Sequence, residues 1–235
     1  RMILDIQKLE TGYGKLKVLL GVDLKVGKES VGLFGPNGAG KTTLINTIMG
    51  MQRPWSGSVK FDGQEIGGKA THLVARSGIA LVPQERELFP GLSVADNLEL
   101  GAAWVPRAAG IEKRQLDMVV QLFPILKERL KQYVGTMSGG QQRMVAIGRA
   151  LMANPLLLIL DEPSLGLQPS IVAEVFERLA LLKKEVAILV TEQNVRESLK
   201  AIDRGYVLEN GAVALEDSAA GLAKNPHVVS AYLGI

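Results

Sequence analysis

The stretch GPNGAGKT at 35–42 constrains the fold more than any other part of the chain. It fits the pattern G-x-x-x-x-G-K-[ST], follows the short apolar run SVGLF at 30–34, and leads into KTTLINTIMG, which fits a helix. Glycines between a strand and a helix let backbone N–H groups converge on phosphate, while the lysine reaches phosphate oxygens and the next hydroxyl can ligate Mg²⁺. We therefore expect a nucleotide site here. Its residues would be Gly35, Pro36, Asn37, Gly38, Ala39, Gly40, Lys41, Thr42 and Thr43.

Other apolar runs indicate an α/β fold around this loop. LLLIL at 156–160 and VAILVT at 186–191 are apolar without alternation, as strands buried on both faces are. Helical stretches at 169–183 and 194–201 separate the strands, and this alternation predicts a parallel sheet with right-handed crossovers. Further strands are expected at 3–7, 18–26, 57–63 (as an edge strand) and 79–82, a hairpin at 204–215, and mostly helix at about 85–153.

The composition excludes several classes of protein and site. The chain has no cysteine, which excludes disulfides and thiolate metal sites. Its 27 basic and 24 acidic residues are scattered, and no basic stripe interleaves with aromatics, so no nucleic-acid partner is expected. The longest apolar runs are far shorter than the roughly 20 residues that cross a bilayer, and no secretory signal is expected.

An acidic pair follows the apolar run LLLIL. Asp161 lies at the carboxyl end of that predicted strand, the edge of a parallel sheet where ligands bind. We expect Asp161 to hold Mg²⁺ through water and Glu162 to polarise the water that attacks a phosphate, since phosphoryl transfer depends on positioning and charge stabilisation.

Five motifs occur together in one order along the chain. They are GPNGAGKTT, Gln84 in VPQE, MSGGQQ at 137–142, LLLILDEPS and SLGLQP at 164–169. This set resembles that of ABC-type ATPases over essentially the whole chain. The resemblance implies ATP and Mg²⁺ as cofactors and a phosphate-loop, RecA-like core with an antiparallel β subdomain and a helical subdomain. The chain would be a single domain, 1–235, with its core at 1–84 and 154–235 and its helical subdomain at about 85–153.

The MSGGQ motif is expected to serve a second subunit. A serine and glycines opening a helix form an anion site, because the first-turn N–H groups are free. In ABC ATPases two cassettes pack head to tail, and this signature of one caps the γ-phosphate held by the other. The resemblance therefore implies that Ser138, Gly139, Gly140 and Gln141 bind the partner's ATP. Met137 stands where leucine is usual, which conserves volume.

The resemblance assigns roles to four further residues. Tyr13 matches the aromatic that stacks on adenine, and Gln84 matches the glutamine that reaches Mg²⁺ and water. Gln168 stands where aspartate is common in the loop that crosses the dimer seam. Gln193 aligns with the usual histidine; its amide can donate a hydrogen bond but carries no proton at neutral pH. The expected catalytic residues are Glu162, Gln193 and Gln84, with the reaction resting mainly on Glu162; the expected metal residues are Thr42, Gln84 and Asp161.

Longer phrases, among them TEQNVRES at 191–198 and DRGYVLENG at 203–211, are similar to the ATPase subunits of high-affinity branched-chain amino-acid importers. This implies a transport motor, peripheral on the cytoplasmic face of the plasma (inner) membrane. Its partners would be transmembrane permease subunits, a second ABC ATPase subunit (a copy or a relative) and, indirectly, an extracytoplasmic substrate-binding protein. ATPases of urea or short-amide importers and of lipopolysaccharide export remain alternatives.

Two other classes and one surface also remain open. A soluble ABC ATPase of DNA repair or translation typically carries a long coiled-coil insertion or two cassettes, and a phosphate-loop kinase would not need MSGGQ. Phe89, Leu92 and Val94 follow Gln84 closely. They either line a groove for a cytoplasmic helix of the permease or pack the core of the helical insert.

Overall fold

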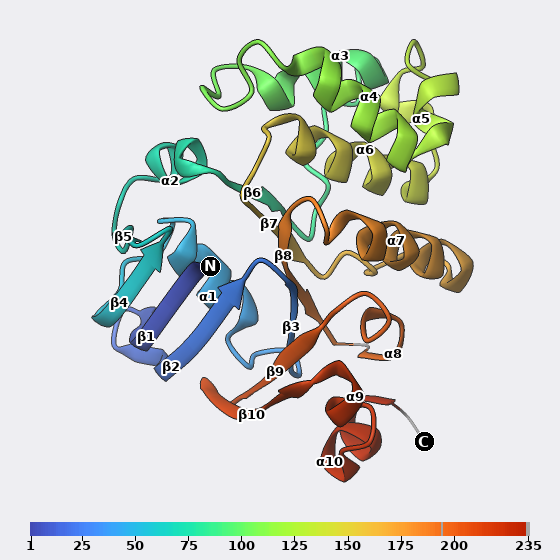
Figure 1. Ribbon diagram of the computed structural model, residues 1–235. Helices are drawn as coiled ribbons and strands as arrows, with labels where there is room; N and C mark the ends of the chain where they lie inside the picture. Colours follow the sequence, from blue (N-terminus) through green and yellow to red (C-terminus); the bar gives the residue numbers. More distant parts are fainter. Residues whose placement is uncertain (194, 234–235) are drawn as a thin grey trace.

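A six-stranded, mostly parallel sheet forms the centre of the molecule, as the apolar runs predict (Figure 1). The computed structural model describes residues 1–193 and 195–233. The strands lie in the order β10 (Ala212–Ser218), β9 (Arg204–Glu209), β3 (Ser30–Phe34), β8 (Ala187–Glu192), β7 (Leu157–Asp161) and β6 (Ile79–Val82). Only β10 is antiparallel to its neighbour. Every residue of β3, β7 and β8 is buried, which explains their unbroken hydrophobicity.

A second, antiparallel sheet contains β2 (Leu16–Gly27), β1 (Met2–Tyr13), β4 (Ser56–Phe61) and β5 (Gln64–Glu65), in that order. The prediction that residues 57–63 form an edge strand is wrong, because β4 lies between β1 and β5. Asp62 and Gly63 have φ angles of 48° and 78°, which turn the chain back tightly into the two-residue strand β5. Strands β1 and β2 are longer than the expected 3–7 and 18–26.

Helices cover both faces of the central sheet. They are α1 (Lys41–Ile48), α2 (Thr71–Ser77), α7 (Pro169–Leu182), α8 (Val195–Ser198), α9 (Ala219–Leu222) and α10 (Pro226–Val228), followed by a π-helical turn, Val229–Leu233. The expected helix at 194–201 is shorter than predicted, and Asn194 lies outside the described residues. No helix in the described part of the chain has the length and hydropathy to cross a membrane.

Residues 94–152 form a group of helices apart from the antiparallel sheet, at the top of Figure 1. They are α3 (Val94–Ala102), α4 (Glu112–Leu122), α5 (Pro124–Glu128), a 3₁₀ turn (Val134–Thr136) and α6 (Gly139–Met152). The predicted helical character of this stretch is thus confirmed. The subdomain boundaries at 84/85 and 153/154 stay a prediction.

The two faces of the central sheet belong to different hydrophobic clusters. Along β7, Leu158 and Leu160 pack with side chains of α3, α6 and α7. Leu157 and Ile159 pack with side chains of α1 and of the antiparallel sheet. This alternation follows from the two-residue period of a strand. The central sheet therefore has the helical group on one face and α1 on the other. The acidic pair follows the end of β7, between these helices.

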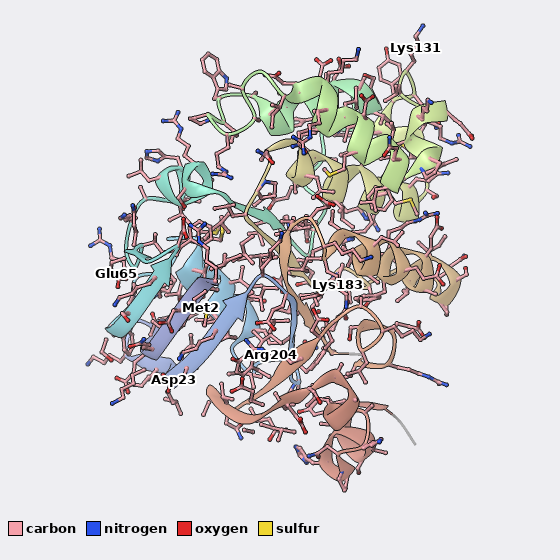
Figure 2. All side chains as sticks on the ribbon, viewed as in Figure 1. Met2, Asp23, Glu65, Lys131, Lys183 and Arg204 are labelled. Atoms are coloured by element: carbon pink, nitrogen blue, oxygen red, sulfur yellow. The ribbon has the colours of Figure 1, made fainter. Side chains whose placement is uncertain are left out.

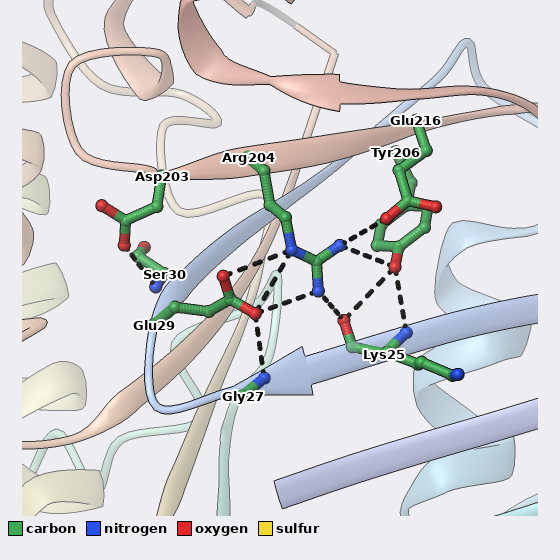
Figure 3. A network of polar contacts seen from close by, with 8 residues as sticks. All are labelled: Lys25, Gly27, Glu29, Ser30, Asp203, Arg204, Tyr206 and Glu216. Atoms are coloured by element: carbon green, nitrogen blue, oxygen red, sulfur yellow. Dashed lines mark hydrogen bonds and ion pairs between the residues drawn. The ribbon is translucent and has the colours of Figure 1, made fainter. Parts of the chain in front are cut away.

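A partly exposed network of polar contacts joins the two sheets (Figure 3). The Arg204 guanidinium pairs with Glu29 at 3.0 Å, with Glu216 at 2.9 Å and with the Tyr206 hydroxyl at 2.7 Å, and donates to the Lys25 carbonyl at 2.6 Å. The same ribbon view with all side chains shows Arg204 at the start of β9, on the side of the antiparallel sheet (Figure 2). Further along this hairpin, Gly211 donates its N–H to the Ala39 carbonyl at 3.1 Å, so the network fixes a strand pair that supports the phosphate loop.

Candidate nucleotide-binding and hydrolysis site

The phosphate loop, residues 35–42, has a backbone that only glycines permit. Gly35, Gly38 and Gly40 have φ angles of 153°, 81° and 109°, in the region that other residues rarely adopt. A Cβ atom on Gly35 would lie 2.2 Å from the Leu208 carbonyl oxygen. Gly40 precedes α1 without a side-chain cap, so the first-turn N–H groups of α1 face the loop. These donors and the helix dipole favour an anion.

Lys41 places its ammonium group inside the loop. Its side chain is 4% exposed and donates to the Gly35 carbonyl at 2.7 Å and to the Pro36 carbonyl at 3.3 Å. The Nζ atom also lies 3.1 Å from Oε1 of Glu162. The loop lysine and the first carboxylate after Asp161, far apart in sequence, thus form one buried ion pair.

Asp161 and Thr42 present oxygen atoms next to each other at the carboxyl end of β7. The Thr42 hydroxyl donates to Oδ2 of Asp161 at 3.2 Å, and the Thr191 hydroxyl donates to Oδ1 at 2.7 Å. Hydroxyl and carboxylate oxygens are ligands that Mg²⁺ accepts, usually with one or two carboxylates and the phosphates of a nucleotide. The donor set therefore fits Mg²⁺. Gln84 lines the same cavity of about 800 Å³ as Thr42 and Asp161.

Glu162 is held by contacts from three directions. Its backbone φ is 46°, a conformation that costs energy for a residue with a Cβ and is often found at functional sites. Its N–H donates to the Thr191 hydroxyl at 3.0 Å, and its carboxylate accepts from Nε2 of Gln193 at 3.2 and 3.3 Å. The same Gln193 amide donates to Oδ1 of Asn37 in the phosphate loop at 2.5 Å. The predicted catalytic pair, Glu162 and Gln193, is thus in contact and faces the loop.

The signature residues lie outside this cluster. Ser138 caps α6: its hydroxyl accepts from the Gln141 N–H at 3.3 Å, and the Gln141 side chain accepts from the Ser138 N–H at 3.2 Å. Packing alone explains why residue 140 is a glycine, since a Cβ atom there would lie 2.6 Å from the Ile171 side chain. Within the described residues, no hydrogen bond or ion pair joins 138–141 to the phosphate loop. Tyr13, at the end of β1, is half exposed and also stands apart.

Two residues of the site were missed by the sequence reasoning. Thr191 hydrogen-bonds to both members of the acidic pair; the only signal was a lone hydroxyl ending the apolar run VAILV. Arg143 on α6 is fully buried and donates to the Pro83 carbonyl at 3.0 Å and the Gln84 carbonyl at 2.8 Å. Burial lowers its pKa to about 10, so it stays charged at neutral pH. Arg143 thereby ties the signature helix to the segment that carries Gln84.

The suggested groove residues do not act together. Val94, at the start of α3, is fully buried and packs in the helical core, which decides between its two alternatives in favour of the core. Phe89 lines the cavity that contains Gln84, and the Arg149 guanidinium lies 6.0 Å from its ring centre. Trp104, 89% exposed, lines the same cavity, whereas Leu92 does not.

Comparisons with known proteins agree with this geometry. A family model described as "ABC transporter" matches residues 19–165. The high-affinity branched-chain amino acid transport ATP-binding protein BraG of Pseudomonas aeruginosa is 46% identical over 99% of this chain and 100% of its own length. The probable branched-chain amino acid transport ATP-binding protein LivF of Archaeoglobus fulgidus is 35% identical over 97% of each chain. The crystal structure of MJ1267, an ATP-binding cassette of an ABC transporter in its ADP conformation, superposes with a TM-score of 0.87 at 29% identity, covering all of both chains.

Proposed function

The chain belongs to the ABC transporter family of ATP-binding proteins, and from this premise we propose that it is the ATP-hydrolysing subunit of an importer for branched-chain or other hydrophobic amino acids. One observation carries the hydrolytic part of the proposal: Lys41, Glu162 and Gln193 form a single contact cluster beside the Thr42–Asp161 pair. The whole-length similarity to two proteins named for branched-chain amino-acid transport supports the cargo.

ATP would bind with its phosphates over the start of α1. The first-turn N–H groups and Lys41 supply positive charge there, and the incoming phosphate would replace Glu162 as the partner of the Lys41 ammonium. Thr42, Asp161 and Gln84 would hold Mg²⁺, which neutralises charge on the phosphates when bound. Tyr13, half exposed at the end of β1, would stack on the adenine.

Once released from Lys41, Glu162 would orient the attacking water and accept its proton. The backbone of Glu162 is left-handed, and its N–H donates to the Thr191 hydroxyl, which in turn donates to Asp161; these contacts fix where the carboxylate starts. Gln193 already contacts both Glu162 and Asn37, so it would hold the carboxylate and donate a hydrogen bond toward the γ-phosphate. A glutamine amide does not take up a proton, so the base would be Glu162.

The signature residues would complete the site of a second ATPase subunit packed head to tail. Ser138 and Gln141 cap each other at the start of α6 and leave further first-turn N–H groups for an anion. Since no hydrogen bond or ion pair among the described residues joins 138–141 to the phosphate loop of their own chain, an ATP held by a partner is the ligand proposed for them. That partner is either a second copy or a related ATPase.

The cavity beside Gln84 is the proposed contact with the transmembrane permease subunits. Phe89, Leu100 and Trp104 line it, and they expose 51%, 43% and 89% of their surface. Exposed apolar side chains around a hollow indicate a protein contact. Through the permease the chain would lie at the cytoplasmic face of the inner membrane and respond, indirectly, to an extracytoplasmic substrate-binding protein. Movement of Gln84 and Arg143 would connect this contact to the nucleotide.

Uptake in the organism that encodes the chain tests the proposed cargo. Replacing the chain with its Glu162→Gln variant should abolish uptake of labelled leucine, isoleucine and valine, and the wild-type chain should restore it. Labelled urea and short amides, together with lipopolysaccharide at the cell surface, test the alternatives in the same strains. Normal amino-acid uptake combined with loss of any of these other activities would reject the proposed cargo.

A further inference from the structure

Glu192 is a buried carboxylate that neither the phosphate loop nor the acidic pair uses. It is the last residue of β8 and is 2% exposed. Both of its oxygens accept from Ser164: Oε1 accepts the Ser164 N–H at 2.9 Å and Oε2 accepts the Ser164 hydroxyl at 2.7 Å, and the Gln193 N–H adds a backbone contact to the carboxylate. Burying a carboxylate is costly, so a specific pair of hydrogen bonds to one loop residue needs a reason.

Ser164 begins the loop 164–168 that follows Glu162 and Pro163. This loop lies at the protein surface: Leu165 is 46% exposed, Gly166 takes a φ of 70°, and Gln168 precedes α7 without a side-chain cap. Its backbone bonds are Leu165 N–H to the Glu162 carbonyl and Leu167 N–H to the Ser164 carbonyl, both at 3.1 Å, and at its far end the Gln168 carbonyl accepts from two N–H groups of α7 at 3.0 Å. The Glu192 carboxylate is therefore the anchor that fixes where the loop starts.

The next residue along the chain, Gln193, contacts the hydrolytic cluster. Its amide donates to Glu162 and Asn37, whereas Glu192 accepts from Ser164. Consecutive residues at a strand end point to opposite sides. Two adjacent residues at the end of β8 thus make different contacts: Gln193 binds the carboxylate proposed as the base, and Glu192 binds the loop that leads away from it.

The charge of Glu192 acts on Arg143 of the signature helix. Arg143 on α6 is buried nearby, and the field of Glu192 raises the pKa of its guanidinium against the lowering that burial causes. Arg143 in turn holds the carbonyls of Pro83 and Gln84. Gln84 and Arg143 also line one hollow together with Leu165 and Gly166, so the loop anchored by Glu192 lies beside the segment that carries Gln84.

We infer that Glu192 is a positioning residue: through Ser164 it locks the loop 164–168 to the strand end that carries Gln193, so that the loop and the hydrolytic cluster move as one unit. The inference rests on the proposed function for its catalytic consequence. A phosphate that moves Gln193 would move the exposed loop with it, and a subunit pressing on the loop would adjust Gln193 and Glu162. The contact would couple hydrolysis to the subunit that faces the loop.

Two substitutions at Glu192 separate this role from simple structural support. Glutamine can keep both contacts, because its carbonyl accepts the Ser164 N–H and its amide donates to the Ser164 hydroxyl. Alanine can keep neither. We expect Glu192→Ala to lower kcat for ATP by about 10- to 100-fold, the range for losing hydrogen bonds to a charged group, with the KM for ATP changed less than about threefold. Glu192→Gln should stay within about threefold of wild type.

Ser164→Ala tests whether the effect passes through the loop. It removes one of the two contacts and should cause a smaller loss of kcat. If Glu192 acts through Ser164, the double variant should be no slower than Glu192→Ala alone, which is the non-additivity expected of residues in contact. Glu185→Ala, at an exposed acid just before β8, is the matched control and should match wild type.

Amide hydrogen exchange on the purified, nucleotide-free chain gives a readout independent of hydrolysis. Peptides that span 164–168 should exchange about tenfold faster in Glu192→Ala and at the wild-type rate in Glu192→Gln and Glu185→Ala. Wild-type exchange in Glu192→Ala, equal loss of kcat in the alanine and glutamine variants, or additive effects with Ser164→Ala would each overturn the inference. A wild-type chain that hydrolyses no ATP would instead count against the proposed function, and the exchange result would still decide whether Glu192 holds the loop.

Discussion

Replacing Glu192 with glutamine is expected to stabilise the fold above neutral pH and to leave it unchanged in acid. Burial raises the pKa of Glu192 from its ordinary 4.5 to about 7, the nearby Glu162 carboxylate adds to the rise, and the hydrogen bonds from Ser164 oppose it. Because one pKa unit corresponds to about 1.4 kcal/mol, ionised Glu192 costs the folded state about 3 kcal/mol. An uncharged glutamine that keeps the contacts to Ser164 avoids this cost.

The sign of the pH dependence follows from the direction of the shift. A folded state with a raised carboxyl pKa binds the proton more tightly than the unfolded chain does, so the contribution of Glu192 to stability falls as pH rises from about 4.5 to about 7. Above about pH 7 the full cost is present. The free-energy difference between Glu192→Gln and wild type should therefore grow from near zero at pH 4.5 to about 3 kcal/mol at pH 8.

Urea unfolding followed by circular dichroism measures this difference at several pH values between 4.5 and 8.5. All other titrating groups are common to both chains, so their contributions cancel in the comparison. Glu185→Gln, at an exposed carboxylate near the same strand, should not change stability at any pH. A Glu192→Gln variant that is less stable than wild type at pH 8, or whose advantage does not change with pH, would refute the reasoning.

Three further outcomes follow from the site. Gln193→Ala should slow ATP hydrolysis by about 10- to 1000-fold, as expected for one lost transition-state donor, and Glu162→Gln should slow it more. An unchanged rate in Glu162→Gln, together with no hydrolysis by Gln193→Ala, would show that the two roles are reversed. At saturating ATP, light scattering should show that Glu162→Gln forms a dimer, alone or with a related ATPase subunit, whereas ADP should give no dimer. Adding Ser138→Arg should prevent the dimer. An ATP-bound dimer of the double variant would therefore reject the binding of a partner's ATP by the signature residues. Phe89→Asp should reduce the permease that co-purifies with the chain, and full recovery of permease would exclude the cavity beside Gln84 as the contact.

The parts of the fold that the sequence predicts well are those with strong local patterns. Residues 30–48 hold a strand, a glycine loop and a helix in immediate succession, so the phosphate loop is fixed by neighbours in the chain. The position of Asp161 follows from a general rule, because parallel strands end at one edge of a sheet. Weak patterns fail: α2 has only a single buried residue, Val74, and β5 has two residues, and neither was predicted.

The rest of the site depends on packing between distant segments. Thr191 and Arg143 contact residues 30 and about 60 positions away, and nothing in their local sequence specifies those partners. Val94 shows the same limit in an apolar residue: a valine that opens a helix can face the core or a groove, and only the packing of α3 decides between them. The pairing of Glu192 with Ser164 likewise follows only from the fold.

Hydrolysis of ATP by the purified chain, measured with and without Mg²⁺, tests the central claim most directly. Wild type should release phosphate only when ATP and Mg²⁺ are both present. Glu162→Gln should bind ATP without turnover, and Lys41→Ala, which removes the ammonium group from the loop, should lose nucleotide binding or turnover while circular dichroism shows an intact fold. Full turnover by folded Lys41→Ala would contradict the account.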